Sequence, residues 1–179
     1  MEKDSSKYPQ LAKDDEALKD EIFALLSVHA NPNPYSDDGA FARAIGKLPR
    51  GLRAMAATHF LDLSLTLDSL TWHFGNFGEP GLVDHTEAGL HELGLHELAE
   101  CFHEARNLMT PLLADRKEED GDSNDILERK GLLEVADQLN QRAWALHPIT
   151  KSKKATESSV IYAAWISYAR KNPENVFDL

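Results

Sequence analysis

The stretch RAMAATHFLDLSLTLDSLTWHF, residues 53–74, decides the fold because its apolar residues fit two different periods. Leucines at every second position from residue 61 to residue 67 alternate with polar residues, as in a half-buried strand. Spacing of three or four, as in a helix, relates Phe60, Leu63, Leu67, Leu70 and Phe74. The stretch is rich in Leu, Ala, Ser and Asp rather than β-branched or aromatic residues, which favours a helix. A second apolar stripe predicts that this helix lies centrally among others and consists of Leu61, Leu65 and Trp72.

Helical spacing recurs on both sides of this stretch. Helices are predicted over residues 11–28, 41–48, 82–93, 95–113, 126–146 and 157–171. Turn-forming residues separate them at 29–39 and 75–81, and Gly94 divides the helices at 82–93 and 95–113. The charged segment 114–125 is predicted to be a mobile acidic loop. The sequence therefore predicts an all-α fold, in which residues 1–179 form a compact single-domain bundle of about six or seven helices around a central Leu-rich helix.

The composition is that of an ordinary globular protein. Of the 179 residues, 42% are hydrophobic and 27% are charged, which allows one well-buried core. The single cysteine, Cys101, cannot form an internal disulfide, and it borders an apolar stripe, so it is predicted to be a small core residue. The first ten residues carry charges where a signal peptide needs an apolar core, and no apolar run is long enough for a membrane helix. We therefore expect a cytoplasmic protein with no membrane association.

The negative charge is concentrated in one part of the chain. The protein has 30 Asp and Glu residues against 19 Lys and Arg residues, which gives a net charge of -11. Residues 76–125 hold 13 acidic and 3 basic residues, so this segment alone carries -10. Such a field repels nucleic acid phosphates and anionic membranes, and it attracts basic partners or cations. The alternative is a solvated face that only keeps the protein soluble.

The stretch GLHELGLHELAECFHE, residues 89–104, raises the question of a metal site because it contains three histidines and four glutamates. His91 and His96 are five residues apart, so on a continuous helix they would point about 140° apart, and Gly94 interrupts the helix between them. His96, Glu100 and His103 share one face, but seven residues rise about 10.5 Å, too far for three side chains to bind one ion. A solvated polar face is the preferred interpretation, and a metal site at His96, Glu100 and His103 is the alternative. No cofactor is predicted.

The aromatic turn TWHFGNFGEPG, residues 71–81, is the most distinctive local feature. No nucleophile motif, phosphate-binding loop or dinucleotide fingerprint occurs in the chain, so the sequence gives no positive support for an enzyme. The turn would more often seal the edge of a core than bind a ligand. The alternative is a binding groove lined by Trp72, His73, Phe74, Asn76 and Phe77.

These elements also occur in a particular order. A Leu-rich helix is followed by an aromatic-x-Asn turn (FGN, Phe74 to Asn76), an acidic residue (Glu79), a short helix, a small-residue break and another amphipathic helix. This arrangement, from about Ala57 to Met109, resembles a bacterial all-helical domain-of-unknown-function family that includes a DNA-mimic protein.

The stretch EAGLHELGLHELAECFHEA, residues 87–105, is similar to the paired helices that this family has around a glycine. Family members usually carry Asn-Gly-Gly-Phe one helical turn before the aromatic turn, whereas this chain has LDSL at residues 67–70. The resemblance implies an all-helical fold. For the DNA-mimic member it implies a homodimer whose acidic surface occupies the DNA-binding face of a transcription factor.

The acidic residues of that surface are not a motif, so the candidates come from the charge count of this chain. Carboxylates at i, i+3 and i+7 of a helix repeat at roughly 4.5 to 6 Å, broadly comparable with the phosphates along a DNA strand. The candidate partner-binding residues are Glu97, Glu100 and Glu104 on one predicted helix, with Asp115, Glu118, Glu119 and Asp120 beyond it.

The leading hypothesis is a non-enzymatic binding protein with an acidic, DNA-mimic-like helical surface. Its partner would be a basic protein, such as a DNA-binding regulator or a toxin, and the chain itself would not bind nucleic acid. Two alternatives stay open. One is a metal-binding protein or hydrolase that uses the His/Glu helix face, and the other is a purely structural or oligomerisation module.

Overall fold

The computed structural model describes residues 7–116, 123–148 and 159–179, with the side chains of residues 114–116 and 123 left aside. The described residues form ten α-helices and one 3-10 helix, and they contain no strand. Their buried apolar side chains join in one hydrophobic cluster. The predicted all-α, single-domain bundle is therefore confirmed, although the helices are more numerous than expected. None of the described helices has the length and apolar character that crossing a membrane requires.

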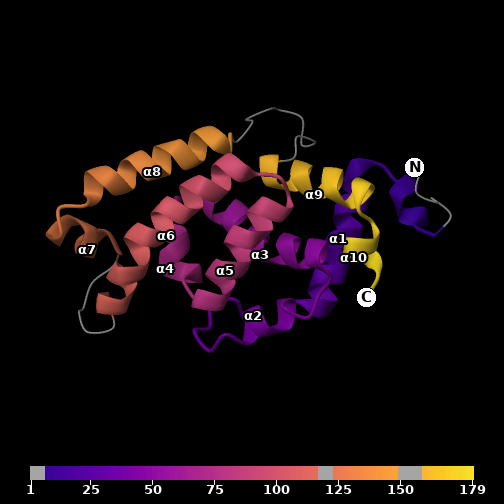
Figure 1. Ribbon diagram of the computed structural model, residues 1–179, viewed down its shortest axis with the longest axis horizontal. Helices are drawn as coiled ribbons and strands as arrows, with labels where there is room; N and C mark the ends of the chain where they lie inside the picture. The colour runs from indigo at the N-terminus through magenta and orange to yellow at the C-terminus, as the bar shows by residue number, and fades with distance from the viewer. Residues whose placement is uncertain (1–6, 117–122, 149–158) are drawn as a thin grey trace.

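Figure 1 shows how these helices are arranged. Helix α3 lies in the interior, and it packs against α1, α2, α4, α5, α9 and α10. Helices α7 and α8 lie towards one end of the molecule, and α1, α9 and α10 lie towards the other. In chain order the elements are η1 (Pro9–Ala12), α1 (Asp15–His29), α2 (Ala40–Ile45), α3 (Arg50–Leu67), α4 (Leu70–Phe77), α5 (Pro80–Glu92), α6 (His96–Arg116), α7 (Ser123–Arg129), α8 (Leu133–Leu146), α9 (Val160–Lys171) and α10 (Glu174–Phe177).

The Leu-rich stretch is helical and central, as predicted, but it is not one continuous helix. Helix α3 ends at Leu67, and α4 begins at Leu70. Ser69 separates them as an N-cap, since its side chain accepts a hydrogen bond from the backbone N–H of Trp72 at 3.1 Å. Leu61 and Leu65 are buried, whereas Leu67 at the end of α3 is 68% exposed. The predicted stripe of Leu61 and Leu65 is therefore buried within α3, whereas the other predicted stripe is interrupted at Leu67.

Two other predicted boundaries are corrected in the same way. The segment 126–146 forms α7 and α8 rather than one helix, because Gly131 has a φ of 67° and turns the chain between them. The predicted turn at 75–81 is reduced to Gly78 and Glu79, since α4 runs to Phe77 and α5 begins at Pro80. The division at Gly94, with a φ of 79°, is confirmed. The predicted acidic loop at 114–125 overlaps α6 and α7 at its ends, and its middle lies outside the described residues.

Helices α3 and α5 pack closely together because a glycine lies at their contact. A Cβ added to Gly89 would lie 3.1 Å from both Cα and O of Ala54 and 3.3 Å from Cγ2 of Thr58. A larger residue at position 89 would force the helices apart. This close packing fixes α5, and with it the turn at Gly94 and the start of α6.

A polar cluster joins α3 to the end of α8 and to the start of α9. Asp62 on α3 accepts a hydrogen bond at 2.9 Å from Nε2 of His147, which directly follows α8. The same carboxylate oxygen, Oδ1, accepts a hydrogen bond from Ser159 Oγ. Ser159 in turn caps α9 by accepting from the backbone N–H of Tyr162. Asp62 therefore connects two segments that the helix packing alone would hold less firmly.

The largest fully buried side chain, Trp165 of α9, packs against α3 and α1. Its indole N–H donates a hydrogen bond of 3.0 Å to Thr58 Oγ1, and its ring lies 5.6 Å from that of Phe23 and 4.8 Å from that of Tyr162. An indole buried with its N–H satisfied contributes a large apolar area without a polar penalty.

The two ends of the described chain meet. Asp178 accepts hydrogen bonds from Lys7 Nζ at 2.8 Å and from Tyr8 Oη at 3.0 Å. Arg170 near the end of α9 donates to the backbone oxygen of Leu11 at 2.6 Å and pairs with Asp15 at 2.7 Å. The labels N and C accordingly lie at the same end of the molecule (Figure 1).

Candidate functional site

Helix α6 carries the predicted acidic face. Its buried side is an apolar stripe that includes Leu98, Phe102 and Met109. Among the described side chains of α6, three carboxylates are exposed on the rest of the helix, at Glu97, Glu100 and Glu104. The i, i+3 and i+7 spacing therefore brings them to the surface, as the sequence predicts.

The three carboxylates are not equivalent. Both carboxylate oxygens of Glu104 accept hydrogen bonds from Nη1 of Arg142 on α8, at 2.7 and 2.8 Å. The hydrogen bond that Arg142 donates to Glu104 is the main reason that the pKa of Arg142 is raised. The charge of Glu104 is thus already matched within the fold. Glu97 and Glu100 are exposed without an ion pair among the described residues, and Glu100 has only a Coulombic interaction with Arg142.

The remaining predicted partner-binding residues cannot be placed beside these two. Asp115 lies in the last turn of α6, but its side chain is outside the description. Glu118, Glu119 and Asp120 lie outside the described residues altogether.

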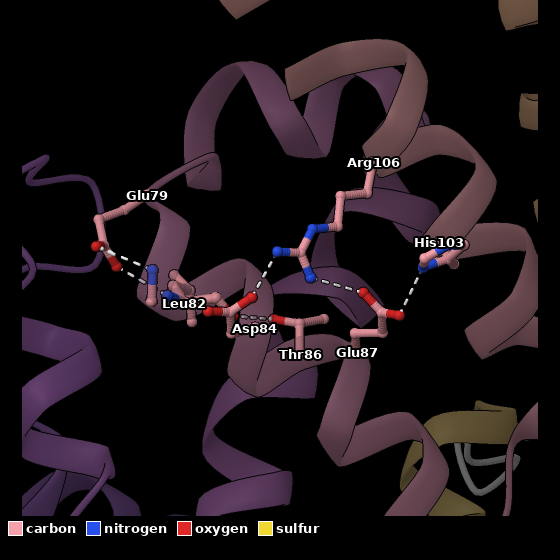
Figure 2. A network of polar contacts seen from close by, with 8 residues as sticks. Glu79, Leu82, Asp84, Thr86, Glu87, His103 and Arg106 are labelled. Carbon is pink, nitrogen blue, oxygen red and sulfur yellow. Dashed lines mark hydrogen bonds and ion pairs between the residues drawn. The ribbon is translucent and has the colours of Figure 1, made fainter. Parts of the chain in front are cut away.

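A polar network ties α5 to the middle of α6 (Figure 2). Arg106 lies between two carboxylates and donates to Glu87 at 2.8 Å and to Asp84 at 2.6 Å. Glu87 also contacts Nδ1 of His103 at 2.8 Å. Burial raises the pKa of Glu87, but the hydrogen bonds from Arg106 and His103 outweigh this effect and hold it below its usual value. Glu87 and Asp84 are therefore neutralised locally and do not extend the free acidic face.

This network bears directly on the alternative metal site. His103 turns towards Glu87 on α5 rather than towards His96 and Glu100. The described residues contain no group of three or more His, Cys, Asp or Glu side chains that could hold a metal ion. No observation in this part of the chain therefore favours the predicted alternative of His96, Glu100 and His103.

His91 and His96 lie close together, with their Nδ1 atoms 3.4 Å apart. On a continuous helix the two side chains would point about 140° apart. The predicted break at Gly94 brings the end of α5 beside the start of α6, and the sequence did not predict that this places the two histidines next to each other. Two exposed imidazoles form a pair, which is fewer ligands than a structural zinc site has.

The aromatic turn is divided between core and surface. His73, Phe74 and Phe77 are at most 1% exposed, so they seal the core, which is the interpretation that the sequence favours for such a turn. Trp72 and Asn76 are partly exposed, and Asn76 Nδ2 donates to the backbone oxygen of Trp72 at 2.9 Å. The predicted groove residues therefore do not share one surface.

His73 is held neutral in the core. Ser64 Oγ donates to the backbone oxygen of Phe60 at 2.7 Å, so it accepts the proton of His73 Nδ1 at 2.9 Å. The other ring nitrogen, Nε2, is buried without a hydrogen-bond partner among the described residues. Burial lowers the pKa of His73 to about 3, because the charged imidazolium would lose its hydration.

We expect His73 to make the folded state sensitive to acid. An unfolded chain has an ordinary histidine pKa near 6.5, so between that value and about 3 the unfolded state binds one more proton than the folded state. Stability then rises with pH in this window and is lost as the pH falls. Between pH 8 and pH 5 this group should remove about 2 kcal/mol from the free energy of unfolding, measured by urea denaturation.

The variant His73→Phe should lose this part of the pH dependence, since it keeps an aromatic ring but has no proton to gain. The matched control is His29→Gln on the exposed end of α1, which should keep the slope of the wild type. An equal pH slope for the wild type and His73→Phe would contradict the assignment.

A groove of about 620 Å³ does lie at the aromatic turn. Of the predicted residues, Phe74 and Asn76 line it, while Trp72, His73 and Phe77 do not. Other lining residues, which the sequence did not indicate, come from the segment before α2, from the start of α5 and from the last turns of α6: Tyr35, Asp37, Glu79, Pro80, Thr110 and Leu113. These segments are far apart in sequence, so only their packing reveals the groove.

Comparison with known proteins assigns the chain to a family. No curated protein and no solved structure matches it. The model of a family described as DMP19-like protein matches residues 46–172, from the residue after α2 to the residue after α9. The match is wider than the resemblance between Ala57 and Met109, and it includes the acidic face of α6 and its contact with α8. Because the match covers well over half of its length, the chain belongs to the DMP19-like protein family.

Proposed function

We propose that this chain is a non-enzymatic binding protein whose acidic surface on α6 engages a basic protein partner in a DNA-mimic-like manner. A DNA-binding regulator or a toxin would be a suitable partner. The observation that carries the proposal is the exposure of Glu97 and Glu100, one helical turn apart, without an ion pair in the described residues. Two exposed carboxylates on one helix attract the basic residues with which such a partner binds phosphates.

The distribution of charge supports this choice of partner. Residues 76–125 carry a net charge of -10. Among the described residues, Arg50, Arg106 and Arg142 form ion pairs with four of the carboxylates of this segment: Glu92, Asp84, Glu87 and Glu104. The remaining field attracts cationic surfaces at long range and disfavours nucleic acid as a direct ligand. Binding would therefore be fast and sensitive to salt.

The test is a charge reversal that leaves the fold intact. The variant Glu97→Lys/Glu100→Lys changes two exposed side chains and spares Glu104, whose reversal would place two cations together at the contact of α6 with α8. A matched control, Asp20→Lys/Glu128→Lys, makes the same change of net charge at exposed positions on α1 and α7. Circular dichroism should first show that all three proteins are folded.

A pull-down from a bacterial lysate at low and high salt then compares the three proteins. We expect the wild type and the control to retain a basic protein at low salt, and the α6 variant to retain at least about tenfold less, the loss of about 1.4 kcal/mol. High salt should weaken retention by all three. If the control loses the partner as fully as the α6 variant, net charge alone is responsible and the proposed surface is wrong.

A further inference from the structure

The groove at the aromatic turn combines apolar and acidic lining residues. Its floor is formed by Phe74, which is 1% exposed, and by Leu113 of α6. Its described lining residues include two carboxylates, Asp37 and Glu79, and no Lys, Arg or His. A cavity of about 620 Å³ lies within the range of ligand-binding sites. The lining therefore offers an apolar floor under hydrogen-bond acceptors.

The orientation of the polar groups is set by bonds to the backbone. Both oxygens of Glu79 accept backbone N–H groups at the start of α5, from Gly81 at 3.0 Å and from Leu82 at 2.8 Å. Figure 2 shows this carboxylate at the start of α5. Each oxygen keeps further acceptor capacity. The N–H₂ group of Asn76 donates a hydrogen bond to the backbone oxygen of Trp72, and the side-chain oxygen of Asn76 accepts no hydrogen bond from the part of the chain that the structure describes.

An aromatic ring stands at the same groove. The ring of Tyr35 packs against that of Phe77, with centroids 4.8 Å apart, yet Tyr35 is 55% exposed. Asp37, two residues later, is exposed and makes no ion pair with a described residue. A cation in the groove would thus meet a carboxylate without a partner, an aromatic face and an amide oxygen together.

We infer that this groove binds the guanidinium group of an arginine from a basic protein segment. A guanidinium is planar, carries only donors and stacks on aromatic rings, so it complements Tyr35, Asp37 and the oxygen of Asn76 better than a lysine ammonium does. The apolar floor accommodates the aliphatic part of the arginine side chain. This site is separate from Glu97 and Glu100, and it rests on the proposed function only in assuming a basic partner.

The experiment measures binding of a peptide of six arginines, capped at both ends, by isothermal titration calorimetry on the full chain. Three variants each remove one negative charge from an exposed position: Asp37→Asn in the groove, Glu100→Gln on α6 and Asp20→Asn as the control. We expect Asp37→Asn to weaken binding about tenfold and Asp20→Asn to weaken it less than about twofold. Tyr35→Ser should weaken binding in the same direction as Asp37→Asn, and a peptide of six lysines should bind the wild type more weakly.

The variants separate this inference from the proposed function. If Glu100→Gln weakens binding and Asp37→Asn matches the control, the groove site is wrong and the acidic face of α6 stands. If Asp37→Asn weakens binding and Glu100→Gln matches the control, the groove site stands and the α6 surface is wrong. Equal weakening by all three variants would overturn both, because the peptide would then respond to net charge alone. A peptide-induced shift of the Asn76 side-chain amide resonances locates the site independently, and no shift at saturation would overturn it.

Discussion

Replacing Asp62 with alanine should lower the free energy of unfolding by about 2 to 4 kcal/mol, because the buried His147 and the half-buried Ser159 lose their acceptor together. His147 is 1% exposed and donates Nε2–H to Asp62, and Ser159 donates to the same oxygen. Each buried group left without a partner costs about 1 to 3 kcal/mol. Urea denaturation at neutral pH measures the change.

Two further variants make this prediction specific. Asp62→Asn keeps the shape and one acceptor oxygen, so it should lose clearly less stability than Asp62→Ala. Asp20→Ala on the exposed face of α1 should change stability by less than about 0.5 kcal/mol. If Asp62→Ala were as mild as Asp20→Ala, the described contacts of Asp62 would not hold the segment after α8 or the start of α9.

Replacing Trp165 with alanine should cost about 3 to 5 kcal/mol, the range for deleting a buried aromatic side chain. The indole is fully buried between α9, α3 and α1, so its removal leaves a cavity that the surrounding helices fill only in part. A thermal melt followed at 222 nm, together with urea denaturation, measures the loss.

Trp165→Phe should be milder than Trp165→Ala, since it retains a ring and loses mainly the hydrogen bond to Thr58. Trp144, which is 41% exposed on α8, provides the matched control. Trp144→Ala should cost less than Trp165→Ala, although its N–H contacts the backbone oxygen of Asp68 at 2.9 Å. Equal losses for the two tryptophans would mean that Trp165 is not a core residue.

The sequence predicted the class of the fold because apolar spacing is a local property. It placed the division at Gly94 for the same reason, since glycine after an apolar helical stretch is a local signal. It missed the division at Asp68 and Ser69, where leucines on both sides continued the helical spacing. The N-capping serine was a signal that could have indicated the break. Gly131 was a second such signal, and it was outweighed by the apolar residues on either side.

The candidate site was harder to predict because its properties depend on tertiary partners. The three glutamates of α6 were correctly expected at the surface, but pairing of Glu104 with Arg142 depends on where α8 packs. His103 similarly finds its partner, Glu87, on a neighbouring helix. The groove combines Asn76 with Tyr35 and Asp37 from a segment that the sequence showed only as a loop. Periodicity within one helix contains no information about such contacts.

The meeting of the chain ends has a practical consequence for all of these measurements. The bonds of Asp178 to Lys7 and Tyr8 hold the two termini of the described chain together, whereas an unfolded chain of 179 residues has a radius of gyration of about 45 Å. Donor and acceptor dyes attached near Pro9 and Leu179 would therefore transfer energy efficiently only in the native molecule. Introduced cysteines can be labelled selectively for this purpose, because Cys101 is fully buried. A single optical signal would then report global unfolding of each variant, independently of helix content.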